Sequence, residues 1–199
     1  MKKLFIILFL GGYIVSSAQS KQDKVAYFAS GCFWCVEAVF ESVKGVDEAV
    51  SGYAGGHTKN PTYRSIGTGR TGHAETVAVY YNPKVVSFET LVYVFFGSQD
   101  PTTVNGQHPD YGTQYRSIAF YTNNKEKEII EKVKNELNKK VYDGKIATEV
   151  TKLDRFYKAE DYHQNYERLH PENPYVQNVS IPRLNRFKRK FPNLLKKGH

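Results

Sequence analysis

The first part of the chain changes from a strand pattern to a helix pattern and back. An apolar run at 25–30 predicts a strand. The apolar residues that follow recur at the spacing of one helix face: Val36, Val39, Phe40 and Val43. Gly45 is a residue type that ends helices, and loosely alternating residues at 46–53 predict a second strand.

A second strand, helix and strand follow a glycine-rich loop at 52–72. Residues 73–81 alternate as a third strand, and residues 115–121 predict a fourth. Between them, Ser87 can cap a helix. The buried face of that helix is predicted to be Phe88, Leu91, Val92 and Phe95.

Further elements follow these two units. Asn124 can cap a third helix, residues 145–156 predict one more strand, and residues 161–170 predict a short helix. This order indicates an α+β protein with helices on one face of a largely antiparallel sheet. We therefore expect a ferredoxin-like two-layer sandwich, also called a split βαβ arrangement, with C-terminal extensions.

The first 18 residues have the layout of a secretory signal peptide. Lys2 and Lys3 precede a mainly apolar core at 4–15, and small residues follow at 16–18. A membrane anchor is the alternative, but the core is short for a span of about 20 residues. We therefore expect a protein that is exported, to the periplasm or the medium, after cleavage of residues 1–18.

The mature chain, 19–199, is expected to form one domain, with a core at about 24–170 and a basic tail at 173–199. The formal net charge is +8. The tail contains no acidic residue and has seven basic ones: Arg183, Arg186, Lys188, Arg189, Lys190, Lys196 and Lys197. Such a tail can bind nucleic acid or a membrane, but we expect neither partner and favour a solvated segment. A short helix that packs through its apolar residues is the alternative.

Cys32 and Cys35 are the only cysteines, and they stand where the strand pattern gives way to the helix pattern. Unpaired N–H groups and the dipole at a helix N-terminus both stabilise a thiolate. We therefore expect a lowered pKa for Cys32, which would act as a nucleophile, with Cys35 as a second thiol one turn away. A structural disulfide is the alternative, although a loop this short would contribute only about 2 kcal/mol.

Three further residues could donate protons or hydrogen bonds. Glu75 begins a strand, and a carboxyl group near burial has a raised pKa and can stay protonated. A solvated glutamate at a strand end is the alternative. Tyr53 and Tyr115 are neutral donors if they face the site, but with fifteen tyrosines packing is the commoner role. The histidines have no zinc-type spacing with the cysteines, so we expect no metal.

Phe33 and Trp34 directly follow the first cysteine, and Trp34 is the only tryptophan. Aromatic side chains beside a nucleophile can form the wall of a pocket for a small apolar group, such as a methyl group. Burial in the core is the alternative, and the residue pattern leaves both open.

Four short motifs occur in one order within residues 26–166. They are Gly-Cys-Phe-Trp at 31–34, Gly-Tyr-Ala-Gly-Gly at 52–56, Gly-His-Ala-Glu at 72–75 and Gly-Thr-Gln-Tyr-Arg-Ser at 112–117. This set closely resembles peptide methionine sulfoxide reductase of the A type. The resemblance implies a ferredoxin-like core and an oxidoreductase that returns the S epimer of methionine sulfoxide in oxidised proteins and peptides to methionine. Its role would be protein repair under oxidative stress.

The resemblance also implies roles for single residues. Cys32 would attack the sulfoxide sulfur, Glu75 would protonate the departing oxygen, and Tyr53 and Tyr115 would hydrogen-bond to that oxygen. Sulfoxide reduction needs a soft nucleophile at sulfur and donors at oxygen, so these residue types suit the reaction. Three more residues would bind the substrate: Phe33 and Trp34 around the methyl group, and Asp110.

Cys35 departs from the pattern of many members, which have glycine here and cysteines in a C-terminal tail. The tail of this chain has no cysteine. The sulfenic acid on Cys32 would then be resolved by Cys35 or by an external thiol, and we favour Cys35. A thioredoxin-like partner would reduce the resulting redox-active disulfide. We expect a monomer with no bound cofactor.

Two other functions fit the Cys-x-x-Cys spacing. A thiol–disulfide oxidoreductase would act on protein disulfides without needing Glu75. A metal-binding module would hold one soft metal ion at Cys32 and Cys35. Both leave the remaining motifs unexplained, so we rank both below the reductase.

Overall fold

A computed structural model describes residues 24–198 of the protein. The predicted signal peptide at 1–18 lies outside the described residues. Among residues 24–198, none of the helices combines the length and the hydrophobicity that a membrane span requires.

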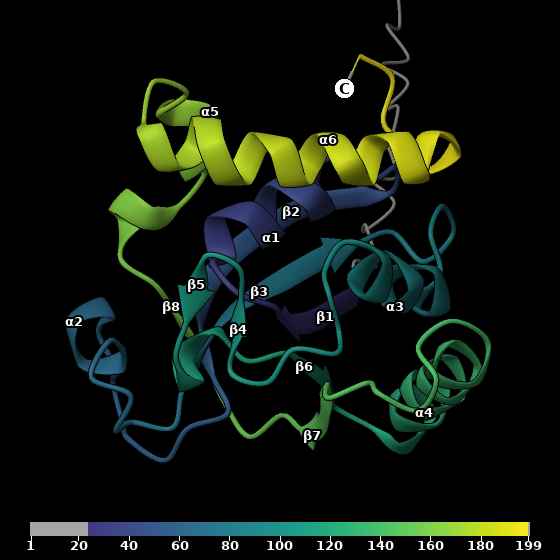
Figure 1. Ribbon diagram of the computed structural model, residues 1–199, viewed down its shortest axis with the longest axis horizontal. Coiled ribbons are helices and arrows are strands. Elements are labelled where there is room, and N and C mark those ends of the chain that lie inside the picture. Colours follow the sequence, from purple (N-terminus) through teal and green to yellow (C-terminus); the bar gives the residue numbers. More distant parts are fainter. Residues whose placement is uncertain (1–23, 199) are drawn as a thin grey trace, which may run out of the picture.

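A six-stranded sheet forms the centre of the molecule, in the order β7-β6-β1-β3-β2-β8 (Figure 1). The strands are β1 (Lys24–Ala29), β2 (Val46–Ala54), β3 (Ala74–Tyr81), β6 (Ile118–Tyr121), β7 (Glu149–Lys152) and β8 (Phe156–Lys158). All neighbours are antiparallel except β6 and β7. A separate small hairpin joins β4 (Gly106–Gln107) to β5 (Asp110–Tyr111).

Within residues 24–198, six α-helices accompany the sheet. They are α1 (Phe33–Glu41), α2 (Tyr63–Ile66), α3 (Phe88–Gly97), α4 (Asn124–Lys140), α5 (Tyr166–Leu169) and α6 (Ile181–Lys190). Short 3-10 turns occupy 113–115, 161–163 and 192–194, and a π-helical turn at 176–180 leads into α6. Figure 1 shows α6 lying across α1, with α3 and α4 together at the other end of the sheet.

The main elements follow the predicted order β1-α1-β2 and then β3-α3-β6. The predicted caps are close to the observed ones. Ser87 accepts a hydrogen bond from the Thr90 N–H at the start of α3, whereas α4 is capped by Asn123 rather than by Asn124. The fourth predicted strand is shorter than expected, because β6 begins at Ile118 and Tyr115 lies in a 3-10 turn. The predicted helix at 161–170 is a 3-10 turn followed by α5.

The predicted strand at 145–156 is wrong, because this segment supplies two strands at opposite edges of the sheet. β7 pairs with β6 and β8 pairs with β2, and only residues 153–155 connect them. Three residues span about 14 Å, whereas the edges of a flat six-stranded sheet lie about 24 Å apart. The sheet is therefore curled so that its two edges approach each other.

The main core lies between the sheet and the helices α1 and α3. Phe28 of β1 stacks on Phe40 of α1 and on Phe95 of α3, with ring centroids 5.1 and 5.0 Å apart. Val77 and Val79 of β3 belong to the same core. Since side chains alternate along a strand, Glu75 lies on this face too, under the N-terminus of α1.

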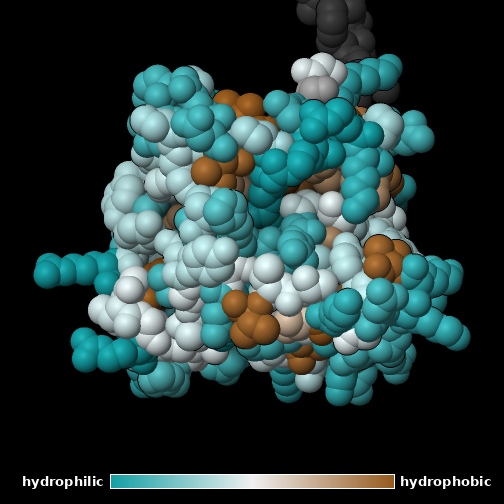
Figure 2. All heavy atoms as spheres, viewed as in Figure 1, coloured by the Kyte–Doolittle hydropathy of each residue, from teal (hydrophilic) through white to brown (hydrophobic). Residues whose placement is uncertain are grey.

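The basic tail is not a solvated segment. Phe187 of α6 is 1% exposed and belongs to the core, and Arg183 is also buried. The packed helix, which the sequence analysis kept as the alternative, is therefore the observed structure. The face seen in Figure 2 is mostly hydrophilic, with apolar side chains in small separate groups.

Candidate functional site

A sharp turn between β1 and α1 places the first cysteine. Gly31 has φ +75°, and a Cβ atom at this position would come within 2.7 Å of the Gln107 Cβ. Only glycine adopts this conformation without strain and leaves this space. The Gly31 N–H donates to the Tyr115 carbonyl oxygen at 3.1 Å, which holds the turn against the 113–115 segment. Cys32 follows as the N-cap residue of α1.

Glu75 lies directly beneath this helix start. It is 1% exposed, and its Oε2 accepts a hydrogen bond of 2.9 Å from the Phe33 N–H. Burial raises the pKa of Glu75 to about 8. The carboxyl group is therefore mainly protonated at neutral pH, as predicted, and its second oxygen can carry the proton.

Two tyrosines that are far apart in the sequence lie beside this carboxyl group. The hydroxyl groups of Tyr63 and Tyr115 lie close enough for each to influence the pKa of the other. Burial, followed by the nearby Glu75 and Cys32, raises the pKa of Tyr63 to about 12. Burial and Glu75 likewise raise the pKa of Tyr115. Both hydroxyl groups therefore remain neutral donors close to Glu75 and Cys32.

Tyr53, which the resemblance placed in this role, has a different partner. Its side chain is fully buried, and its hydroxyl group donates to Glu160 Oε2 at 2.6 Å. Glu160 Oε1 also accepts from the Tyr63 N–H at 3.0 Å. Although burial opposes it, the hydrogen bond from Tyr53 contributes to a lowered pKa for Glu160, which is therefore ionised. Tyr53 stands opposite Glu75 in the register of β2 and β3, and through Glu160 it is also linked to the backbone of Tyr63.

The sequence analysis missed Tyr63, Glu160 and His163. Tyr63 follows Asn60-Pro61-Thr62, and Thr62 caps α2 through the Ser65 N–H, so a turn signal was present. Glu160 and His163 lie 85 or more residues beyond Glu75, and no local pattern connects them with it.

Phe33 and Trp34 line an aromatic cluster. Phe33 is 1% exposed and lies 4.9 Å from the His163 ring, measured between centroids. Trp34 is half-buried, stacks on Tyr166 at 3.7 Å, and donates its indole N–H to His163 Nδ1 at 3.2 Å. Burial lowers the pKa of His163, so its ring is neutral and its proton is on Nε2. Within the described residues this Nε2 has no hydrogen-bond partner.

The pKa values of the two thiols do not follow the prediction. Burial raises the pKa of Cys32, and the neighbouring Cys35 and Glu75 raise it further. The pKa of Cys35 is lowered, first by a hydrogen bond from Cys32 and then by the charge of Arg183. The prediction of a lowered pKa at Cys32 is therefore wrong. The helix N-terminus does not overcome burial here, because the Phe33 N–H is already bonded to Glu75.

The surroundings of Cys35 come from the C-terminal part of the chain. The Tyr175 hydroxyl oxygen lies 3.9 Å from Cys35 Sγ and donates to Asp110 Oδ2 at 2.5 Å. Arg183 donates from Nε to the Ser98 carbonyl oxygen at 2.9 Å, and from Nη1 and Nη2 to Ser30 at 2.9 and 3.0 Å. Asp110, predicted to bind substrate, is therefore placed on the Cys35 side of α1.

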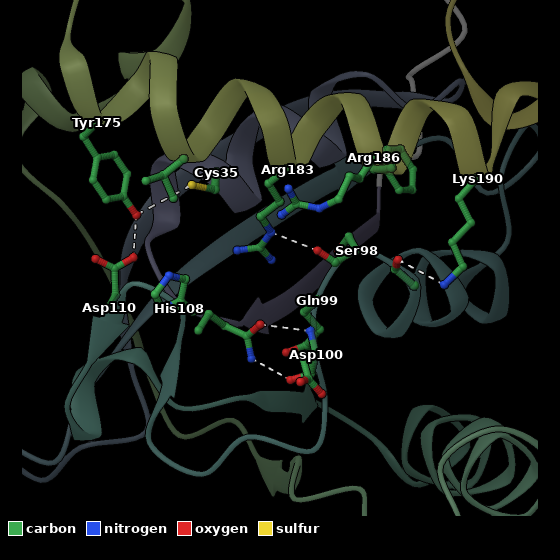
Figure 3. A pocket seen from close by; sticks show the side chains of 14 residues that line it. Cys35, Ser98, Gln99, Asp100, His108, Asp110, Tyr175, Arg183, Arg186 and Lys190 are labelled. Carbon is green, nitrogen blue, oxygen red and sulfur yellow. Dashed lines mark hydrogen bonds between the residues drawn. The ribbon is translucent and has the colours of Figure 1, made fainter.

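A cavity of about 450 Å³ opens beneath α6 (Figure 3). Its wall includes the side chain of Cys35, whereas Cys32 does not line it. The other lining residues come from α3 and the loop after it, the β4–β5 hairpin, and the 175–190 segment. Within residues 24–198, no group of three or more His, Cys, Asp or Glu residues is arranged to hold a metal ion.

The chain was compared with known proteins. Residues 24–195 match the family described as peptide methionine sulfoxide reductase. Peptide methionine sulfoxide reductase MsrA of Polynucleobacter asymbioticus is 45% identical over 171 residues, which cover 85% of this chain and 90% of that protein.

Solved structures of similar proteins agree with this match. Mxr1 from Saccharomyces cerevisiae in reduced form is 37% identical, with a TM-score of 0.72 and coverage of 76% of this chain and 87% of that one. Mxr1 in complex with Trx2 is 30% identical, with a TM-score of 0.53 and coverage of 72% and 84%.

Proposed function

Because the chain belongs to the peptide methionine sulfoxide reductase family, A type, and is an oxidoreductase of that activity, we propose a thiol mechanism on the S epimer of methionine sulfoxide in oxidised proteins and peptides. The observation that carries the mechanism is the buried, protonated Glu75 held by the Phe33 N–H next to Cys32. A protonated carboxyl group beside a sulfur nucleophile is what oxygen removal from a sulfoxide requires. Neither a thiol–disulfide exchange site nor a metal site requires this protonated carboxyl group.

In the first step, Cys32 Sγ attacks the sulfoxide sulfur. Glu75 protonates the sulfoxide oxygen, and the resulting hydroxyl group passes from the substrate sulfur to Cys32 Sγ while the bond between the two sulfurs breaks. The products are methionine and a sulfenic acid on Cys32. Tyr63 and Tyr115 donate hydrogen bonds to the oxygen as negative charge develops on it. We assign this role to Tyr63 in place of Tyr53, since the Tyr53 hydroxyl group is bonded to Glu160.

The aromatic side chains of Phe33 and Trp34 hold the methyl group of the substrate, and Asp110 contacts the substrate on the Cys35 side. The contact of Phe33 with the His163 ring and the stacking of Trp34 on Tyr166 support a rigid apolar wall. A rigid wall places the sulfur near Cys32 at little entropic cost.

In the second step, Cys35 resolves the sulfenic acid. Its thiolate attacks Cys32 Sγ, the two sulfurs bond, and the hydroxyl group leaves as water after protonation. The proximity of the two thiols, each of which shifts the pKa of the other, supports this step. A thioredoxin-like dithiol then supplies two electrons to the disulfide, as the complex of Mxr1 with Trx2 suggests for that relative.

Several wider features belong to the same proposal. The strand order of β6, β1, β3 and β2 supports a ferredoxin-like core. Export by the signal peptide at 1–18, a monomeric state and a role in protein repair under oxidative stress remain proposals from the sequence.

A single-turnover experiment tests this function. Reduced protein is mixed with a peptide that contains either the S or the R epimer of methionine sulfoxide, and the peptide and the intact protein are weighed by mass spectrometry. We expect about one methionine per chain from the S epimer, none from the R epimer, and a loss of mass from the protein that corresponds to two hydrogen atoms, as the disulfide forms. Turnover by a Cys32→Ser variant would refute the mechanism.

A further inference from the structure

The cavity beneath α6 has the size of a small-molecule site. Its volume of about 450 Å³ lies within the range of about 300–1,000 Å³ that ligand pockets occupy. Cys35 is 2% exposed and lies in its wall, so a molecule must enter the cavity to reach this sulfur (Figure 3).

One wall of the cavity is cationic. Arg183, Arg186 and Lys190 stand at i, i+3 and i+7 of α6 and share one face of the helix. The hydrogen bonds of Arg183 all go to neutral oxygens of Ser30 and Ser98. These three positive side chains line the cavity together with the carboxylates of Asp100 and Asp110, so positive charges outnumber negative ones there by one.

The opposite side of the cavity is polar. Gln99 lines it, and both polar atoms of the Gln99 amide are buried without a hydrogen-bond partner. The two carboxylates there already accept hydrogen bonds: Asp100 from Thr102, and Asp110 from Tyr175. Buried amide groups without partners are uncommon, and a bound carboxylate group would supply an acceptor.

We propose that this cavity admits a small thiol that carries a carboxylate group, and that this thiol reduces the Cys32–Cys35 disulfide by attack at Cys35. The cationic face of α6 holds the carboxylate while the sulfur reaches Cys35. The proposal rests on the proposed function in one respect, which is that Cys35 resolves the sulfenic acid. It adds a reductant that needs no protein partner.

The exchange balances as two thiol–disulfide steps. The thiolate of the small molecule attacks Cys35 Sγ, a mixed disulfide forms there, and the Cys32–Cys35 bond breaks with Cys32 leaving as a thiolate. A second thiolate attacks the small-molecule sulfur and releases Cys35. Two thiols are oxidised to one disulfide, and the protein gains two electrons. Arg183 favours the second step because it stabilises the Cys35 thiolate that leaves.

The test starts from protein whose disulfide is formed with diamide, so it does not depend on sulfoxide reduction. Three thiols of similar size are compared at equal thiolate concentration: 3-mercaptopropionate, 2-mercaptoethanol and cysteamine. We expect 3-mercaptopropionate to react about tenfold faster than the neutral thiol and cysteamine to be slowest, with the preference falling as salt is added. Equal rates for the three thiols, or reduction by a thioredoxin alone, would overturn the proposal.

A matched pair of variants locates the effect. Arg186→Gln with Lys190→Gln removes two charges from the cavity, whereas Arg189→Gln with Lys197→Gln removes two from residues that do not line it. We expect the preference for 3-mercaptopropionate to disappear in the first double variant and to persist in the second. The same loss in both would contradict a defined site.

The failure of this proposal can be told from a failure of the proposed function. Single-turnover reduction of methionine sulfoxide by the reduced protein measures the first step alone. If that step succeeds and the three thiols react equally, only the cavity proposal fails. If diamide forms no disulfide, the cavity proposal and the resolving role of Cys35 fail together.

Discussion

The two cysteines lie one helical turn apart, but their surroundings differ in kind. Cys32 faces a buried neutral acid and two tyrosines, and its pKa is raised by burial. Cys35 faces the cationic helix α6, which contributes to its lowered pKa. One Cys-x-x-Cys motif can therefore serve two steps, because two neighbouring positions at the start of α1 contact different groups from distant parts of the chain.

The groups near Cys32 can donate protons and hydrogen bonds to a substrate oxygen. Glu75 is kept neutral by burial, and the tyrosines stay protonated for the same reason. Near Cys35, negative charge is stabilised by Arg183, which lines the same cavity. If this contrast is correct, variants on the two sides should affect different steps of the reaction.

The largest effect is expected on the Cys32 side. Glu75→Gln removes the acid but keeps a group that can accept the Phe33 N–H bond. We expect a fall of about 100- to 10,000-fold in the single-turnover rate of sulfoxide reduction. Glu89→Gln, an exposed glutamate on α3, serves as the control. A native rate in the Glu75 variant would remove the basis for the contrast.

The pH profile of the same step sharpens this assignment. Glu75 donates only while it is protonated, and its pKa is about 8. Below that value the acid is present, and above it the rate should fall by about tenfold per pH unit. The fall should be missing in the Glu75→Gln variant. A native profile that keeps rising through pH 9 would contradict Glu75 as the acid.

The second-largest effect on the rate distinguishes the role of Tyr63 from that of Tyr53. We expect Tyr63→Phe to slow sulfoxide reduction by about a hundredfold, since one donor to the developing oxygen charge is lost. Tyr53→Phe should change the rate less and should instead lower the free energy of unfolding by about 1–3 kcal/mol, because Glu160 loses a buried partner. Stopped-flow rates and chemical denaturation measure the two. The reverse ranking of rates would return the donor role to Tyr53.

The Cys35 side is tested by separating turnover from recycling. In Cys35→Ser the first step should remain, and intact mass should show a protein heavier by one oxygen atom, since the sulfenic acid persists. Steady-state turnover with a dithiol protein should then fall strongly while the first turnover stays near the native rate. Fast recycling in this variant would mean that an external thiol resolves the sulfenic acid directly.

The smallest expected effect is on the acidity of Cys35. Arg183→Gln should raise the pKa of Cys35 by about one unit, because a nearby positive charge is lost. The pH dependence of alkylation by iodoacetamide measures it in a Cys32→Ser background, where Cys35 is the only thiol. Arg189→Gln on the same helix is the control. An unchanged pKa would mean that α6 does not contribute to the charge of Cys35.

The predicted order of elements agrees with the structure where the pattern is local and long. The helical spacing after Cys32 and the alternation at 73–81 each correspond to one element, α1 and β3. The strand predicted at 145–156 did not show that the curled sheet uses this segment at both edges. Pairing depends on strands that are distant in the sequence, so periodicity alone could not divide this segment.

In the site, too, the residues identified from local sequence patterns differ from those that depend on distant segments. Gly31, Cys32 and Glu75 were found because each lies at the end of a predicted strand or the start of a helix, where side chains are aimed by the local backbone. Tyr53 received its donor role from the family resemblance, through the motif at 52–56, and Tyr63 was not considered. The structure places the hydroxyl group of Tyr53 on Glu160 instead.

The sequence by itself determined the family, the order of strands and helices around Cys32, and the residue types that sulfoxide reduction needs. Only the tertiary structure decided which thiol carries the lower pKa, that the hydroxyl group of Tyr53 donates to Glu160, and that the basic tail packs over Cys35. The reason is physical. Backbone conformation and periodicity are local properties, whereas pKa shifts and hydrogen-bond partners depend on burial and on charges brought from distant segments, such as Arg183 of α6.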